Sequence, residues 1–423
     1  MADISYINLK YRPSDNDIVC VFYVEPNDVS LEVAAENIAK ESSIGTWADI
    51  EMDRHTKRIK PNVFSIDARN SIIKIAYPSQ LFEPGNMPQI LSSVAGNIFG
   101  MNIVKNLRLE DIEFPKKILN SFKGPYYGVD GIRKLLGVKQ RPLVGTIIKP
   151  KLGLTSDKHA QCAYEAWTGG CDIVKDDENL TSQTFNSFKE RIIKTLDKRD
   201  KAEKITGEKK IYMPNITAET EEMLKRAEFV KEHGGEYVMV DVFTVGFSAL
   251  QTLRKHNDKL KLVIHAHRAM HAAMTKNKRH GISMLAFAKI FRLIGVDQLH
   301  IGTAVGKMGG TKVEVHEIGE EIEEKFYHPV KPTHAIEQNW YNIKPVFAVC
   351  SGGLHPGHIP ALMDFLGNNI IIQMGGGIHG HPDGTFRGAV AARQAVDAVM
   401  RKIPLDKYSQ THIELKRALE KWE

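Results

Sequence analysis

Eight short apolar runs between residues 144 and 377 constrain the fold more than any other feature of this chain. Each run has the length of a buried strand, and helix-like stretches such as 219–235 and 281–295 lie between them. The runs are VGTIIKP (144–150), GCDIVKDDE (170–178), KKIYMPNIT (209–217), YVMVDVF (237–243), KLVIHAH (261–267), DQLHIGTAVG (297–306), PVFAVCSGG (345–353) and NIIIQMGGG (369–377). Eight strands that alternate with helices are typical of a (β/α)8 barrel, an α/β fold.

The first 124 residues have a different order of elements. Strand-like runs at 19–26 and 72–78 alternate with an amphipathic stretch at 29–41 and a helical stretch near 88–98. This mixture predicts a small α+β domain of the ferredoxin-like kind. Gly124 and Pro125 mark a boundary in front of the barrel. We therefore expect an N-terminal α+β domain at 1–124 and a barrel domain with C-terminal helices at 125–423.

Charge and cysteine content exclude several classes of protein. Lys plus Arg (57) exceeds Asp plus Glu (51) by only 6, and no basic block suggests a nucleic-acid partner. The four cysteines, Cys20, Cys162, Cys171 and Cys350, are too far apart for a CxxC metal site or a disulfide framework. The N-terminal residues lack a signal-peptide core, and no run is long enough to span a membrane. We expect a cytoplasmic protein without membrane or nucleic-acid partners.

Polar residues end most of the apolar runs. The C-terminal ends of barrel strands meet on one face, where the active sites of such barrels are built. The sequence therefore predicts one site from residues that are far apart along the chain. They are Lys149, Asp177, Glu178, His267, His300, Ser351 and the glycines at 375–377.

The segment GGCDIVKDDENL (169–180) carries the clearest chemistry. Lys175 and Asp177 share a face of the strand, and Glu178 follows where the strand ends. Two carboxylates suit Mg²⁺, which prefers oxygen ligands and few of them from protein. Lys175 is either an ion-pair partner of these carboxylates or a lysine that reacts with CO2. The resulting carbamate would supply a third anionic oxygen ligand.

Two further segments carry basic side chains at strand ends. Lys149 and Lys151 share a face, and they are read either as a general base of lowered pKa or as two phosphate-binding lysines. In HAHRAMHAA (265–273), Arg268 has the planar fork that suits phosphate oxygens. Zinc is the weaker interpretation of this segment, because it lacks the HExxH pattern. Some of the histidines in this region, His265 or His280, are expected to be packed structural groups without a chemical role.

Two nucleotide-binding motifs are present only in incomplete form. GTAVGK (302–307) is one residue short of a Walker A loop and continues into Met308. Gly375, Gly377 and Gly380 have the GxGxxG spacing, but we expect no helix to begin there, which argues against a dinucleotide site. A phosphate cradle of backbone N–H groups after the eighth strand fits better. Lys307, flanked by glycines, is either a solvated lysine or part of a loop that closes over substrate.

Taken together, the strand-end motifs resemble those of the RuBisCO large-subunit family. GTIIKPKLGL, GGCDIVKDDENLTSQTF, HAHRAMHAA, HIGTAVGKMGG, SGGLHPGHIPAL and QMGGGIHGHPDG occur in the family's order, preceded by ESSIGTW (41–47) and AGNIFG (95–100). The amino acids in these motifs are most similar to those of the archaeal form III branch of the family. The resemblance covers nearly the whole chain.

The resemblance implies roles for the barrel residues. Lys175 would be the carbamylated lysine, and Asp177 and Glu178 would complete the Mg²⁺ ligands. Lys149 and His267 would handle protons, and Lys307 would close over the site. The remaining barrel residues would bind substrate: Arg268, His300 and Ser351 at one phosphate, Gly353, Gly375 and Gly376 at the other, and Lys151, Gly352 and Gln373 beside them.

The same resemblance implies a second subunit in each site. Glu41, Thr46, Trp47 and Asn97 would bind substrate, with Glu41 and Asn97 reaching the site from the N-terminal domain of the partner. The minimal functional unit would be a homodimer with shared active sites. Dimers could assemble further, and no small subunit is implied.

The resemblance implies a carboxylase acting on ribulose 1,5-bisphosphate. CO2 would add to the enediol and yield two 3-phosphoglycerates, O2 would compete, and the pathway would be AMP-derived ribose salvage. The alternative is a RuBisCO-like enolase or isomerase acting on a methylthio-sugar phosphate, and a third reading is an inactive sugar-phosphate binder. The departures from the family, Gly309 and Ile147, concern loop closure and CO2/O2 discrimination.

Overall fold

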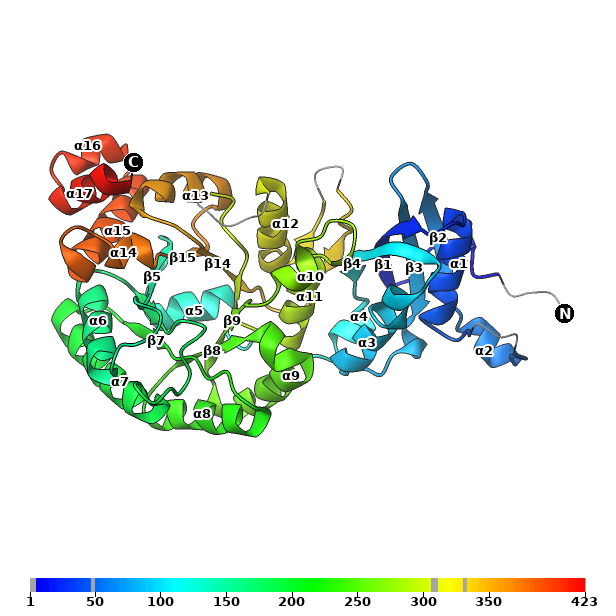
Figure 1. The fold of residues 1–423 in the computed structure, drawn as a ribbon, viewed down its shortest axis with the longest axis horizontal. Helices are drawn as coiled ribbons and strands as arrows, with labels where there is room; N and C mark the ends of the chain where they lie inside the picture. Colours follow the sequence, from blue (N-terminus) through cyan, green and yellow to red (C-terminus); the bar gives the residue numbers. More distant parts are fainter. Residues whose placement is uncertain (1–4, 47–49, 306–310, 330–332, 423) are drawn as a thin grey trace. The chain divides into compact units, whose positions relative to one another are not determined.

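The computed structural model describes residues 5–46, 50–305, 311–329 and 333–422, and these fall into two compact units. Unit 1 comprises residues 1–124, 270–295 and 324–343. Unit 2 comprises residues 125–269, 296–323 and 344–423 (Figure 1). The two-domain division at residue 124 that the sequence suggested stays a prediction.

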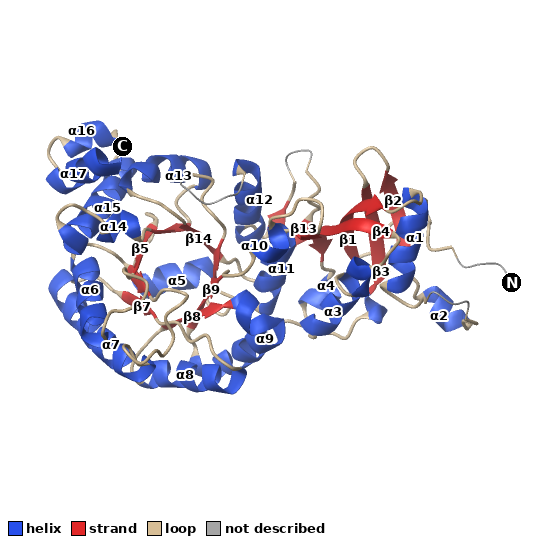
Figure 2. Ribbon diagram, viewed as in Figure 1, coloured by secondary structure: helices blue, strands red, loops and turns tan. Residues whose placement is uncertain are grey.

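Unit 2 contains a parallel barrel of eight strands (Figure 2). Its order is β7-β6-β5-β15-β14-β11-β9-β8. The ends of this order meet where the Met239 N–H donates to the Pro214 carbonyl and the Ile216 N–H donates to the Met239 carbonyl. Each strand coincides with one of the eight predicted runs, except that β5 begins one residue earlier, at Leu143, so the predicted barrel is confirmed. The strands are β5 (Leu143–Ile147), β6 (Ile173–Lys175), β7 (Ile211–Met213), β8 (Tyr237–Asp241), β9 (Val263–His267), β11 (Gln298–His300), β14 (Phe347–Ser351) and β15 (Ile370–Gln373).

The bottom of the barrel is an apolar core. Alternate residues of the strands, such as Leu143, Ile173 and Val263, pack together there and are fully buried. Helix α5 (Gly128–Leu136) contributes Val129, Ile132 and Leu136 to the same core. Their spacing of three and four residues puts them on one face of the helix, which closes this end of the barrel.

Helices follow the barrel strands along the chain and surround them in unit 2 (Figure 2). Several begin at side-chain caps; for example, the Thr155 hydroxyl accepts from the Lys158 N–H. The helices of unit 2 after α5 are α6 (Ser156–Thr168), α7 (Phe188–Thr206), α8 (Thr220–Glu232), α9 (Val242–Leu260), α12 (Lys312–Glu323), η3 (Pro356–His358), α13 (Ile359–Leu366), α14 (Gly376–His379), α15 (Gly384–Met400), α16 (Leu405–Ser409) and α17 (Ile413–Trp422). No helix in the described ranges has the length and apolar character needed to cross a membrane.

Unit 1 is built on a five-stranded sheet of order β10-β4-β1-β3-β2. Strands β1 to β4 are antiparallel and occur along the chain in a β-α-β-β-α-β order, which confirms the predicted ferredoxin-like α+β fold. The elements of residues 5–124 are β1 (Asp17–Pro26), α1 (Leu31–Glu41), α2 (Arg54–Arg58), β2 (Asn62–Asp67), β3 (Ile72–Pro78), η1 (Ser79–Leu81), α3 (Met87–Val94), η2 (Asn97–Gly100), β4 (Val104–Glu113) and α4 (Lys116–Leu119). The later elements of unit 1 are α10 (Ala272–Thr275), β10 (Gly281–Ile282), α11 (Met284–Ile294), β12 (Phe326–Tyr327) and β13 (Gln338–Asn339).

Two details of unit 1 differ from the sequence prediction. Strand β2 was missed, because NVFSID alternates too little to stand out as an apolar run. The helix expected near 88–98 ends at Val94. At Gly96 a Cβ atom would lie only 2.0 Å from the Ser92 carbonyl oxygen, so this close approach of the backbone requires glycine.

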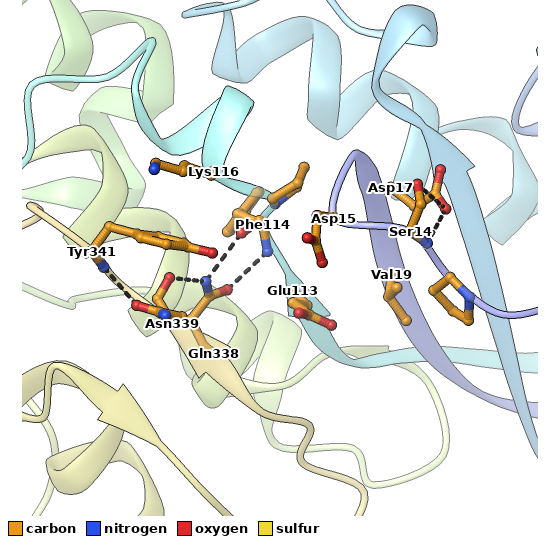
Figure 3. A pocket seen from close by; sticks show the side chains of 12 residues that line it. Ser14, Asp15, Asp17, Val19, Glu113, Phe114, Lys116, Gln338, Asn339 and Tyr341 are labelled. Carbon is orange, nitrogen blue, oxygen red and sulfur yellow. Dashed lines mark hydrogen bonds between the residues drawn. The ribbon is translucent and has the colours of Figure 1, made fainter.

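A polar pocket of about 150 Å³ lies in unit 1 (Figure 3). The side-chain amide of Gln338 bonds to both the N–H and the carbonyl of Phe114 at its edge. The lining residues are Pro13, Ser14, Asp15, Asp17, Val19, Glu113, Phe114, Pro115, Lys116, Gln338, Asn339 and Tyr341. None of these belongs to the predicted active site.

A buried ion pair ties three segments of unit 1 together. The Lys289 ammonium of α11 lies 2.9 Å from the Asp111 carboxylate of β4, and neither side chain is exposed. Asp111 also accepts the Ile336 N–H at 2.8 Å. A charge without its partner in such a place is costly, so we expect the pair to matter for stability.

We predict that Lys289→Met lowers the free energy of unfolding by about 3–5 kcal/mol, because the Asp111 carboxylate loses its counter-charge while still buried. Urea-induced unfolding followed by circular dichroism measures the change. Adding Asp111→Asn should recover part of the loss, since it removes the buried charge while its amide oxygen still accepts one of the two backbone N–H groups, those of Ile112 and Ile336. The exposed pair Lys201–Asp197 provides the control, and Lys201→Met should change little. Equal effects of both lysine substitutions would contradict the prediction.

Candidate active site

The polar residues at the top of the barrel share one face of their strands with the apolar core below. Side chains alternate along a strand, so Tyr237, Met239 and Asp241 all point into the barrel. On β6, β8, β14 and β15 the lower inward residues are apolar and the last is polar, whereas β9 and β11 also carry the buried polar residues His265 and Gln298 below their last residue. This alternation brings together Lys175, Asp241, His267, His300, Ser351 and Gln373 at the carboxyl ends of the strands.

Two carboxylates and two lysines meet at the end of β6. The Lys149 ammonium lies 2.7 Å from Asp177, and the Lys151 ammonium lies 3.5 Å from Glu178. Although burial opposes ionisation of Asp177, the hydrogen bond and charge of Lys149 hold its pKa below the ordinary value. Burial likewise opposes ionisation of Glu178, but the Lys175 charge holds its pKa below the ordinary value, so both carboxylates are anionic at neutral pH.

Lys175 lies beneath these carboxylates with 1% of its side chain exposed. Its Nζ donates to the Asp176 carbonyl at 2.8 Å and to the Met239 thioether at 3.1 Å, whereas Glu178 is 4.0 Å away. Burial lowers the pKa of Lys175, against the attraction of Glu178 and Asp177. The amine is thus held close to the two carboxylates without a tight ion pair.

His267 is oriented by a carboxylate that the sequence analysis did not single out. Its Nδ1 lies 2.6 Å from Asp241, and its Nε2 lies 3.7 Å from Glu178. Burial raises the pKa of Asp241 to about 6 and lowers the pKa of His267 to about 3. At neutral pH Asp241 is therefore ionised and accepts the proton on Nδ1, which leaves the Nε2 lone pair free.

His300, Ser351 and Arg268 form a second group on the far side of the barrel mouth. Nδ1 of His300 lies 2.7 Å from the Ser351 hydroxyl. A Cβ atom at Gly302 would lie 3.1 Å from the Arg268 guanidinium, so glycine makes room for the arginine just after β11. Burial lowers the pKa of Arg268 to about 10, which still leaves it charged at neutral pH. A cation, a hydroxyl and an imidazole converge here.

The glycine-rich ends of β14 and β15 lie against each other and against Lys149. A Cβ atom at Gly377 would lie 2.2 Å from the Leu354 carbonyl, and one at Gly375 would lie 3.0 Å from Cε of Lys149. Gly352 and Gly353 follow Ser351 with positive φ values of 127° and 72°. A side chain at Gly375 or Gly377 would be crowded by these neighbours, so glycine lets the two loops pass close to each other and to Lys149.

The expectation that no helix begins at Gly375 is wrong, because the one-turn helix α14 starts at Gly376. The dinucleotide reading still fails, since β15 is a strand of the barrel, between β5 and β14, and not of an open sheet. Gln373, at the end of β15, is fully buried. Neither polar atom of its side chain has a hydrogen-bond partner within the described part of the chain.

The remaining predicted residues lie elsewhere or beyond the described ranges. Glu41 ends α1, Thr46 follows it, and the exposed Asn97 begins η2, all in unit 1. Helix α1 contacts η2, which brings the segments of Glu41 and Asn97 together. Trp47, Lys307 and Gly309 lie outside the described residues.

A buried network behind β6 fixes the backbone that carries the site. Asp176 points away from the barrel interior and accepts from Arg191 at 3.1 Å, from the Tyr212 hydroxyl at 2.7 Å and from the Asn215 N–H at 3.0 Å. Arg191 also donates to the Thr181 carbonyl. Although burial opposes ionisation of Asp176, the Arg191 charge lowers its pKa. The network holds the segment on both sides of Asp177.

Sequence reasoning missed Asp176, Arg191, Tyr212 and Asp241. Asp241 ends the apolar run YVMVD and could have been found by the rule that found His267. The other three could not, because Arg191 and Tyr212 belong to ordinary-looking helix and strand segments. Their roles depend on which elements the fold places side by side.

Comparison with known proteins places the chain in a family. Residues 128–422 match the catalytic domain of the ribulose bisphosphate carboxylase large chain, and residues 5–118 match its N-terminal domain. The chain belongs to this family. The predicted RuBisCO resemblance is thereby confirmed, as is the prediction that the chain is an enzyme, a carbon–carbon lyase.

Archaeal members of the RuBisCO family are similar over their whole length. The ribulose bisphosphate carboxylases of Methanocaldococcus jannaschii and Methanosarcina mazei are 50% and 51% identical, over 99% of this chain and 100% and 98% of theirs. The octameric enzyme of Pyrococcus horikoshii superposes with a TM-score of 0.92 at 48% identity, covering 98% of this chain and 96% of its own. The dimeric archaeal Rubisco of Hyperthermus butylicus gives 0.94 at 44% identity, covering 99% and 98%.

We predict that Tyr212→Phe destabilises this RuBisCO-family chain by about 1–2 kcal/mol, because Asp176 loses a charge-assisted hydrogen bond in a buried site. Tyr237→Phe is the matched control: Tyr237 is equally buried in the neighbouring strand β8, and its hydroxyl has no hydrogen-bond partner among the described residues. The control should leave stability unchanged or slightly raised. Thermal unfolding of both variants measures the difference, and equal midpoints would contradict the role given to Asp176.

Proposed function

We propose that the chain is a ribulose-1,5-bisphosphate carboxylase, which adds CO2 to the enediol of its substrate and yields two 3-phosphoglycerates. The observation that carries this proposal is the environment of Lys175, a buried amine close to two carboxylates but not tightly paired with either. The reading of Lys175 as a simple ion-pair partner predicts a shorter contact than the observed 4.0 Å to Glu178. An amine that reacts with CO2 needs to be close to the carboxylates without a tight ion pair to either, and Lys175 is placed in this way.

The donor set fits Mg²⁺ only if Lys175 is modified. Within the described ranges, no three His, Cys, Asp or Glu side chains converge in a way that could hold a metal ion. Asp177 and Glu178 supply two carboxylates, and a carbamate formed by CO2 on Lys175 would supply the third oxygen ligand. When bound by these three residues, Mg²⁺ would act as a Lewis acid that polarises substrate oxygens.

Two side chains are placed to move protons. His267 presents a free Nε2 lone pair toward the carboxylate cluster, while Asp241 fixes the ring. Lys149 reaches the same cluster from the end of β5. We assign proton abstraction at the substrate carbon and protonation of the product to this pair, since each can hold a proton at a nitrogen facing the mouth.

The two ends of the barrel mouth suit the two phosphates of the substrate. Arg268, His300 and Ser351 would bind one phosphate through a cation and hydrogen-bonding side chains. The backbone N–H groups near Gly353, Gly375 and Gly376 would bind the other, with Thr46 and Trp47 beside them. Lys151, Gly352 and Gln373 complete the substrate-binding set; the buried amide of Gln373 has no hydrogen-bond partner among the residues that the structure describes.

We extend the proposal to the assembly. Glu41 and Asn97 of a second subunit would complete each site, so the homodimer would be the smallest active unit, with larger assemblies made of dimers. Lys307 would close over the site and stabilise the carboxylate that forms when CO2 adds. The relatives named above include a dimer and an octamer, which supports assembly of either size.

The wider context is also a proposal. O2 would compete with CO2, because the enediol is open to either gas. We propose a role in the salvage of AMP-derived ribose, as the resemblance to the archaeal form III branch implies. We propose a cytoplasmic location, supported by the four cysteines being free thiols.

We predict that Lys175→Ala lowers carboxylation by more than about 100-fold, because the carbamate can no longer form and the metal site loses a ligand. Incorporation of labelled bicarbonate into 3-phosphoglycerate measures the activity. A carbamate signal in the 13C NMR spectrum after addition of 13CO2 and Mg²⁺ should appear in the wild type and be absent from the variant.

Lys210→Ala is the control for that experiment, since Lys210 is another buried lysine, located at the start of β7. It should keep the carbamate signal. Near-wild-type carboxylation by Lys175→Ala would overturn the metal site. Proton exchange at the substrate without CO2 uptake by the wild type would favour the enolase alternative instead.

We predict that Asn97→Ala and Lys175→Ala chains, each inactive alone, regain activity when mixed. Random reassociation makes half of the dimers hybrid, and each hybrid has one intact site, so about one quarter of wild-type activity should return. Size-exclusion chromatography of differently tagged chains confirms that subunits exchange. No recovery in chains shown to exchange would count against a shared site.

A further inference from the structure

A chain of four hydrogen-bonding side chains crosses the barrel interior and ends at Ser351. Oε1 of Gln298 lies 2.8 Å from Nδ1 of His265, and Nε2 of His265 lies 2.9 Å from Nε2 of His300. Nδ1 of His300 lies 2.7 Å from the Ser351 hydroxyl. Gln298 and His265 are fully buried, and His300 is 3% exposed. The residues come from three neighbouring strands, β9, β11 and β14.

Only two arrangements of protons satisfy all three contacts. Both imidazoles are neutral, because burial lowers the pKa of His265 and of His300 well below the ordinary value. A neutral imidazole has one N–H and one lone pair, so two rings that meet through their Nε2 atoms must have one donor and one acceptor. Fixing either ring therefore fixes the other, and with it the Ser351 contact.

In the inward order, the Ser351 hydroxyl donates to His300, His300 donates to His265, and His265 donates to Oε1 of Gln298. In the outward order, Nε2 of Gln298 donates to His265, His265 donates to His300, and His300 donates to Ser351. Both orders contain the same protons, one on each ring and one on the hydroxyl. At Gln298, the buried end of the chain of side chains, the two orders differ only in whether Oε1 or Nε2 of the amide faces Nδ1 of His265.

The ligand at Ser351 decides between the two orders. Phosphate oxygens at neutral pH are mainly acceptors, so a hydroxyl that binds them must donate its only hydrogen to them. Ser351 can do so only when His300 donates to it, which is the outward order. The Gln298 amide can meet this demand, because Nε2 in its present orientation has no partner among the described residues that would hold it in place.

We propose that Gln298 and His265 are positioning residues that set the direction of the proton on Ser351 and so tune its affinity for a phosphate oxygen. The proposal rests on the proposed function in one respect, that a phosphate group binds at Ser351. Gln298 suits the task because an amide can either donate or accept, whereas a carboxylate only accepts and an ammonium or guanidinium only donates.

A double-mutant cycle tests the coupling between Gln298 and Ser351, which do not touch each other. A methionine at 298 keeps the length and apolar stem, but its sulfur can only accept, so Gln298→Met favours the inward order. We expect KM for ribulose bisphosphate to rise about 5-fold, with kcat changed less. In a Ser351→Ala background, the same substitution should raise KM by less than about 2-fold, because the contact it controls is already gone.

Gln338→Met in unit 1 is the control for the loss of a buried amide, and it should leave KM unchanged. Additive effects of Gln298→Met and Ser351→Ala would show that Gln298 has only a structural role, and would overturn the relay. An unchanged KM in Ser351→Ala would overturn both the relay and the phosphate contact at Ser351.

Nitrogen NMR of the protein labelled with 15N-histidine tests the relay without any substitution in it. Inorganic phosphate is the probe. Variants that each replace one histidine assign the signals. Phosphate should move the protonated nitrogen of His300 from Nε2 to Nδ1 and that of His265 from Nδ1 to Nε2, with one common midpoint. A response of one ring alone, or a second proton on either ring, would overturn the relay. If the two histidines respond to phosphate as expected but the protein forms no 3-phosphoglycerate, the relay is supported and the proposed function is contradicted.

Discussion

Closure of eight parallel strands into a barrel is the constraint on which the rest of unit 2 depends. Once the sheet closes through Asn215 and Met239, every second side chain has to point into a confined interior. At the bottom that interior is filled by apolar residues and sealed by α5. At the top the same face continues as Lys175, Asp241 and His267, so the site is the upper layer of the core and has little freedom to move.

Two of the buried carboxylates at this upper layer are tolerated because each has a partner on a neighbouring element. Asp241 of β8 holds His267 of β9, and Asp176 is held from outside the barrel by Arg191 of α7. Lys175 differs from these, since its nearest contacts are a carbonyl and a thioether. This buried cation, held by a carbonyl and a thioether, is the group to which we assign the reaction with CO2.

The histidines show how one residue type serves different purposes in one site. His267 is fixed in a single tautomer by a carboxylate, which accepts only. His265 and His300 are linked instead to an amide and a hydroxyl, each able to donate or accept. A fixed proton suits a group that must act as a base, and an adjustable one suits a group that must adapt to a ligand.

The sequence by itself determined the barrel, the α+β unit and the residues at the strand ends, because period-two alternation and apolar runs depend only on neighbours along the chain. The same rule could have included Asp241, which ends its run as His267 does. Only the tertiary structure decided that Arg191 and Tyr212 meet at Asp176, and that Gln298 reaches Ser351 through two imidazoles. These contacts join residues on different strands and helices, and their pairing depends on strand order and side-chain direction, which no local pattern contains.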